Sequence, residues 1–162
     1  MISELNFEEF HKTLNELTVE GTPSYKGNLL IFFTINFSEK PFYGFVSKNE
    51  FAISKNSNIK SMPYIIRGDF KKFEDKTEVD YEIKLIKFGY YWIKLMSIIF
   101  LIIALLALFV VFSTFYNRGE INPMILVFFF TLFFSIFANV DLYLKKKKFE
   151  KLFLKNLKIK NI

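Results

Sequence analysis

Three carboxylates alternate along one predicted strand, at Glu78, Asp80 and Glu82. Side chains two residues apart on a strand point to the same side, about 7 Å from each other. That spacing suits a divalent cation or paired acid–base chemistry. Because Lys84 continues the same row, the pattern favours a solvated strand face over a catalytic pair or a metal site.

The chain has few residues that could support other catalytic chemistries: it has one histidine, His11, and no cysteine. A chain without cysteine has no disulfide, no thiolate nucleophile and no cysteine-ligated metal. One histidine in a predicted helix supports neither a Ser–His–Asp set nor a histidine-ligated metal cluster, and the sequence contains no glycine-rich phosphate-binding motif. We therefore expect a non-enzymatic protein with no catalytic, cofactor-binding or metal-binding residues.

Basic residues gather in residues 145–162, which hold eight lysines and one glutamate. The whole chain has a formal charge of +6, so the rest is close to neutral, and we expect no nucleic-acid partner. Lysines that follow an apolar span attract anionic lipid headgroups, although this tail could instead be only a topology signal or bind a specific partner. The predicted lipid contacts are Lys145, Lys146, Lys147, Lys148, Lys151 and Lys155.

Small and polar residues recur at helical spacing within two apolar segments. Such residues let helices approach closely and hydrogen-bond to each other. Three roles remain open for them: packing within one hairpin, self-association, or a polar pathway through an oligomeric pore. The predicted face comprises Ser97, Ala104, Ala107, Thr131, Ser135 and Asn139.

The apolar segments themselves, residues 95–117 and 121–140, contain no charged side chain. About 20 helical residues cross the hydrocarbon core of a bilayer, so each segment is long enough. Their close succession predicts a transmembrane hairpin over residues 89–144, with spans at about 93–116 and 122–144. Aromatic residues with a polar group favour the headgroup level. The predicted interface anchors are Tyr90, Tyr91, Trp92 and Tyr143.

A small β-rich domain is predicted in front of the hairpin. Residues 1–19 form an amphipathic helix that begins with a capping box at Asn6 and Glu9, and residues 20–28 form a linker. Residues 29–88 predict an antiparallel β-meander or small half-barrel, because apolar and polar residues alternate there. Strands are expected at 29–37, 41–47, 50–54, 64–73 and 77–86.

Orientation follows from the lysines beside the spans. Lys145–Lys148 follow the second span, whereas the hairpin loop holds one arginine and one glutamate. Loops rich in lysine and arginine stay on the cytoplasmic side. We therefore expect a multi-pass membrane protein with both termini, the β domain and a basic tail, residues 145–162, in the cytoplasm.

A series of strand and turn residues runs through the predicted sheet. It comprises Phe42, Gly44, Val46, Phe51, Ile53, Pro63, Ile65, Gly68, Phe70, Thr77, Val79, Tyr81 and Ile83. With the apolar span that follows, residues 42–115 resemble a group of small uncharacterised bacterial membrane proteins, in which a β-rich domain precedes a transmembrane pair. Gly68 falls one residue later than in that pattern. The resemblance implies this architecture in a bacterial inner membrane and brings no activity or site residues.

These observations predict a membrane α+β protein that acts as a tethered interaction or regulatory module. Its β domain would bind an unknown protein partner, or a second copy of the chain, at the cytoplasmic face of the inner membrane. The alternative is an effector that senses a ligand through the β domain and whose hairpins oligomerise to permeabilise the membrane.

Overall fold

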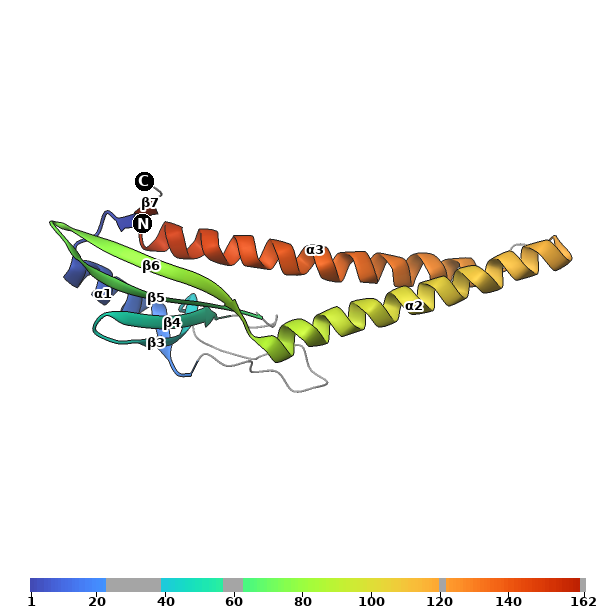
Figure 1. Cartoon of the computed structure of the whole chain (residues 1–162), viewed down its shortest axis with the longest axis horizontal. Coiled ribbons are helices and arrows are strands. Elements are labelled where there is room, and N and C mark those ends of the chain that lie inside the picture. Colours follow the sequence, from blue (N-terminus) through green and yellow to red (C-terminus); the bar gives the residue numbers. More distant parts are fainter. Residues whose placement is uncertain (23–38, 57–62, 120–121, 161–162) are drawn as a thin grey trace. The chain divides into compact units, whose positions relative to one another are not determined.

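The computed structural model describes four stretches of the chain: residues 1–22, 39–56, 63–119 and 122–160 (Figure 1). The chain divides into two compact units, one of Met1–Gly89 with Lys145–Ile162 and one of Tyr90–Leu144. The first unit is therefore built from both ends of the chain, and the second from its middle.

A seven-stranded mixed sheet forms the first unit, in the order β2–β3–β4–β5–β6–β1–β7. Strands β3 to β6 form an antiparallel meander, β1 pairs antiparallel with both β6 and β7, and β2 runs parallel to β3. The strands are β1 (Ile2–Ser3), β2 (Thr18–Glu20), β3 (Phe42–Val46), β4 (Glu50–Lys55), β5 (Tyr64–Phe73), β6 (Lys76–Leu85) and β7 (Ile159–Lys160).

The predicted meander is confirmed for β3 to β6, which match four expected strands to within one residue at every end. The expectation of a wholly antiparallel sheet is wrong, because β2 is parallel to β3. Strands β1, β2 and β7 were not predicted, since segments of two or three residues carry no periodicity. The strand expected at 29–37 lies outside the described residues.

Helix α1 (Phe7–Leu17) begins with the predicted capping box. The Glu9 N–H donates to Asn6 Oδ1 over 2.9 Å, and the Asn6 N–H donates to Glu9 Oε2 over 3.3 Å. Phe10 and Leu14 are fully buried, and the Phe10 ring lies 5.0 Å from that of Phe70 on β5. The helix therefore packs on the sheet, as its apolar face predicts.

The end of helix α3 (Met124–Asn156) covers the same face of the sheet as α1. Phe149, Phe153 and Leu157 are spaced by four residues, share one side of the helix and are fully buried. The core they join comprises Phe10, Leu14, Phe42, Phe51, Ile53, Tyr64, Ile66, Phe70, Val79, Phe149, Phe153, Leu157 and Ile159. The structure thus differs from the predicted separate tail: residues 145–160 continue α3, add strand β7 and complete the β domain.

Phe153 occupies a gap in the sheet surface that a glycine leaves. Gly68 pairs with Phe51 on one side and Tyr81 on the other, and the Phe153 ring lies 5.4 Å and 5.1 Å from those two rings. A Cβ atom at Gly68 would lie 2.2 Å from the Asp80 carbonyl oxygen. Only glycine fits this position, and α3 packs above it.

The second unit consists of α2 (Lys87–Arg118), from Tyr90 onward, and the first part of α3. Both helices are long and apolar enough to span a membrane. Gly119 ends α2 with a φ of +69°, and its N–H donates to the Phe115 carbonyl over 2.8 Å, the usual helix end at a glycine. Two long apolar helices in succession agree with the predicted hairpin.

Candidate functional site

The polar residues of the second unit meet in the seam between α2 and α3. Asn139 Nδ2 donates to Ser97 Oγ over 2.6 Å, and Lys94 Nζ donates to Asn139 Oδ1 over 2.5 Å. Ser97 Oγ also donates to the Ser135 carbonyl over 3.1 Å. Three of the six residues predicted for a packing face are thus joined in one network.

The other three predicted residues are buried as well: Ala104, Ala107 and Thr131. The Thr131 hydroxyl donates to the Val127 carbonyl over 2.7 Å on its own helix. Lys94 belongs to the network but was not predicted, because a lysine near the start of a span is expected to extend towards water. The polar groups of the seam therefore form their hydrogen bonds within one hairpin.

The face of the sheet opposite α1 and the end of α3 carries a row of carboxylates. Glu50 pairs with Asp69 across β4 and β5, and Asp69 pairs with Asp80 across β5 and β6. All three side chains are exposed. Like charges opposite each other on neighbouring strands destabilise a sheet, and Arg67 and Lys71, two residues either side of Asp69 on β5, flank the row on the same face.

The alternating carboxylates of β6 separate into different environments. Glu78 forms an ion pair with Lys71 over 3.1 Å, and Glu82 pairs with Lys84. Asp80 belongs to the row across the strands. Within the described part of the chain, no group of three or more histidine, aspartate or glutamate side chains is placed to hold a metal ion.

A basic hollow of about 750 Å³ lies in the first unit, between the end of α3, β6 and the paired strands β1 and β7. Five lysines and two glutamates contribute to its lining. The lining residues are Met1, Glu4, Tyr81, Lys147, Glu150, Lys151, Leu154, Lys155, Lys158, Ile159 and Lys160.

Three of the six lysines predicted to contact lipid, Lys147, Lys151 and Lys155, line this hollow. Lys145, Lys146 and Lys148 lie elsewhere on α3. Lys158 and Lys160 were missed by the sequence analysis, although their spacing from Lys151 and Lys155 continues the same basic series. Of the predicted interface anchors, Tyr91 and Tyr143 are exposed, and Tyr90 and Trp92 are half-buried.

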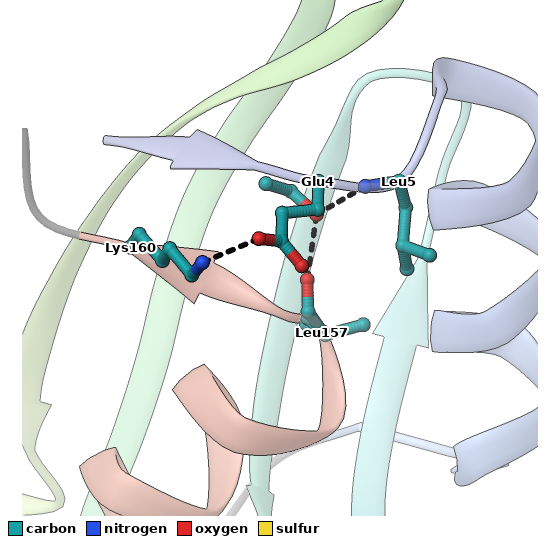
Figure 2. A network of polar contacts seen from close by, with 5 residues as sticks. Glu4, Leu5, Leu157 and Lys160 are labelled. Carbon is teal, nitrogen blue, oxygen red and sulfur yellow. Dashed lines mark hydrogen bonds and ion pairs between the residues drawn. The ribbon is translucent and has the colours of Figure 1, made fainter.

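Two glutamates at the hollow are already engaged. Figure 2 shows Glu4 directed at Lys160, to which it pairs over 2.5 Å. The hydrogen bond from Lys160 lowers the pKa of Glu4, and the same bond raises the pKa of Lys160. The Tyr81 hydroxyl donates to Glu150 over 3.1 Å. Burial, together with that bond, raises the pKa of Tyr81 to about 12.

Strands β1 and β7 are also joined near this ion pair. Ser3 Oγ donates to the Leu157 carbonyl over 2.6 Å and accepts from the Leu5 N–H over 3.2 Å. The Leu157 carbonyl lies close to the helix end, so Ser3 satisfies a group that α3 leaves without an intrahelical partner.

Comparison of the chain with protein-family models, curated proteins and solved structures finds no match.

Proposed function

We propose that this chain is a membrane-tethered binding module without enzymatic activity, and that the carboxylate row on the sheet face opposite α1 and the end of α3 receives a protein partner. The observation that carries the proposal is the exposed row of Glu50, Asp69 and Asp80. A partner with basic side chains would relieve the repulsion within this row, so the partner is a basic segment of another protein.

The face of the sheet suits this role better than its edges. Within the described residues, the outermost strands of the sheet are β2 and β7, which have three and two residues. Strands this short offer few main-chain groups to a strand added from outside, which is how proteins limit unwanted edge pairing. Partner binding through side chains of β4, β5 and β6 is therefore the favoured mode.

The second unit supplies the tether in this proposal. Its two helices present large apolar side chains outward, among them Leu106, Phe109 and Phe129, and such surfaces are stable in hydrocarbon. The lysines from residue 145 onward favour a cytoplasmic β domain in the inner membrane of a bacterium. Lysines of this end also contact anionic headgroups in this proposal.

Site-specific photo-crosslinking tests the partner proposal. A photoreactive residue at Asp69 should give an adduct in cells, whereas one at Lys12, on the exposed side of α1, should not. Replacing Asp80 by asparagine should reduce the Asp69 adduct while making the sheet more stable, because it removes a like-charge pair. Absence of any adduct at Asp69, or equal adducts at both positions, would contradict the proposal.

A cysteine scan tests the orientation, since the chain has no cysteine of its own. A single cysteine at Lys48 should react with a membrane-impermeant maleimide only after the cells are opened. Changing Lys145–Lys148 to glutamate should reverse or disturb insertion. Labelling of Lys48→Cys in intact cells that carry the native lysines would refute the cytoplasmic placement.

The effector alternative makes a different use of the seam. Ser135 and Asn139 bond to Ser97 within one hairpin, which supports packing rather than a pore lining. Replacing Thr131, Ser135 and Asn139 by leucine distinguishes the two proposals in a dye-leakage assay with proteoliposomes. Leakage that these substitutions abolish would favour the effector, and an absence of leakage from the native protein would exclude it.

A further inference from the structure

The basic hollow carries more positive charge than its own carboxylates neutralise. Glu4 and Glu150 contribute to the lining, but Lys160 and Tyr81 already engage them. Among the described residues, Lys151, Lys155 and Lys158 form no ion pair and are exposed. Five lysines against two glutamates leave the hollow with an excess of positive charge, and a concave surface with such an excess concentrates anions.

We propose that this hollow binds a compact polyanion with two or more phosphate groups, either a soluble compound or a lipid headgroup. Lysine ammonium groups bind phosphate oxygens as point charges, without the fixed geometry that arginine imposes. The hollow contains no arginine among its lining residues, so it fits a flexible or variable phosphate group better than a planar carboxylate pair.

The spacing of the lysines sets the size of the ligand. Lys147, Lys151 and Lys155 are separated by four residues and lie on one side of α3, and Lys158 follows three residues later. A rise of 1.5 Å per residue places Lys147 and Lys155 about 12 Å apart along α3, and Lys158 lies just beyond the end of the helix. One phosphate group cannot reach all of them, whereas a chain or cluster of phosphates can. Repulsion between lysines four residues apart destabilises the helix, and a bound polyanion would remove it.

The backbone of Lys158 is an independent indication. Its φ is +49°, a left-handed conformation in which glycine normally ends a helix. The Lys158 N–H bonds to the Lys155 carbonyl over 3.4 Å, and the Lys158 carbonyl accepts from the Glu4 N–H over 3.1 Å. The left-handed conformation costs backbone energy at a lysine, and it holds a residue whose side chain lines the hollow.

The test uses the full chain in phosphatidylcholine nanodiscs, with inorganic triphosphate as the probe and isothermal titration calorimetry as the measurement. The variant combines Lys155→Gln with Lys158→Gly, which removes two charges and places glycine where the backbone favours it. The control combines Lys48→Gln with Lys72→Gln, which removes two exposed charges of the same unit outside the hollow.

We expect saturable binding of triphosphate to the native chain and a loss of about tenfold or more in the variant. The control should bind within about twofold of the native affinity. Absence of saturable binding, or equal losses in variant and control, would overturn the proposal, because either result leaves only general attraction between charges. Circular dichroism of the variant shows that its fold is retained; if Lys155→Gln prevents folding, Lys158→Gly alone provides the test.

Cardiolipin separates the two sources of phosphate, because its headgroup carries two phosphate groups. If nanodiscs with cardiolipin weaken triphosphate binding to the native chain but not to the variant, the hollow is occupied by a lipid headgroup. If cardiolipin leaves the affinity unchanged, the ligand is soluble. The carboxylate row on the opposite sheet face uses other charged residues, so failure here would leave crosslinking at Asp69 unaffected.

Discussion

The two units of this protein use the same side chains in opposite ways. In the first unit the phenylalanines form the core, and Phe149 and Phe153 are 0% exposed. In the second unit phenylalanines face outward, with Phe129 59% exposed, while Ser97 and Ser135 are buried at 4% and 6%. Phe149 and Phe153 thus lie on the inside of one unit, and Phe129 lies on the outside of the other.

Helix α3 contains both arrangements in one continuous run of residues. Up to Leu144 it belongs to the second unit, and from Lys145 it belongs to the first. Lysines begin where the burial pattern reverses. The proposed membrane location of the second unit would account for this reversal: hydrocarbon would accept phenylalanine and leave hydrogen bonding to the seam, whereas water drives phenylalanine into a core.

The largest expected effect comes from separating the two ends of the chain. A fragment of residues 1–89 lacks Phe149, Phe153 and Leu157, and we expect it not to form the native sheet. A synthetic peptide of residues 145–162, added in excess, should restore dispersed amide resonances in a nuclear magnetic resonance spectrum. A folded fragment without the peptide would show that the end of α3 is dispensable for the core.

Two phenylalanines of α3 provide a smaller and more direct comparison. Phe153→Ala should lower the free energy of unfolding of the first unit by about 3–5 kcal/mol, because it empties a fully buried site. Phe129→Ala on the same helix should change it by less than about 1 kcal/mol, since alanine is also tolerated in hydrocarbon. Hydrogen exchange of the β5 amides in nanodiscs measures both values. Equal losses would contradict the reversal of burial along α3.

Sequence patterns predicted the elements that are long and periodic. The four strands from Phe42 to Leu85, helix α1 with its Asn6 cap and the two apolar helices all repeat their pattern over several turns or alternations. Strands β1 and β7 were not predicted, because a segment of two residues cannot show a period. Their pairing depends on contacts between the two ends of the chain, such as that of Ser3 with Leu157.

The role of residues 145–160 was misjudged for a physical reason. An apolar stripe beside lysines has the same spacing whether it lies on lipid or on a sheet, so Phe149 and Phe153 did not reveal their partner. The basic hollow was likewise not foreseen, because Glu4, Tyr81 and Lys158 are far apart in the sequence and meet only after folding. The regular spacing of lysines along α3 was the one feature of the sequence that could have indicated the basic hollow.

Within the second unit, the seam should contribute modestly to stability. Asn139→Leu removes the acceptor of Lys94 and the donor to Ser97, and we expect a loss of about 1 kcal/mol in mixed-micelle unfolding. Val140→Leu, at an exposed neighbouring position, is the matched control and should be neutral. A double-mutant cycle with Ser97→Ala should give a favourable coupling energy; zero coupling would remove the seam network as a source of stability.

The smallest effect concerns one proton in the first unit. Burial and the bond to Glu150 raise the pKa of Tyr81 to about 12, whereas an unfolded tyrosine titrates near 10. Below pH 10 both states hold the phenol proton, so stability does not depend on this group. Between pH 10 and 12 the folded state keeps the proton that the unfolded state loses, so the free energy of unfolding falls as the pH rises.

Tyrosinate absorbance at pH 11 measures this difference. Tyr81→Phe should leave the absorbance nearly unchanged, because Tyr81, with its raised pKa of about 12, is still largely protonated there. Glu150→Gln should increase it, since removing the negative charge lowers the pKa of Tyr81 towards its usual value. A fall in absorbance on Tyr81→Phe would mean that the phenol titrates normally, and that Glu150 is free to neutralise the lysines of the hollow.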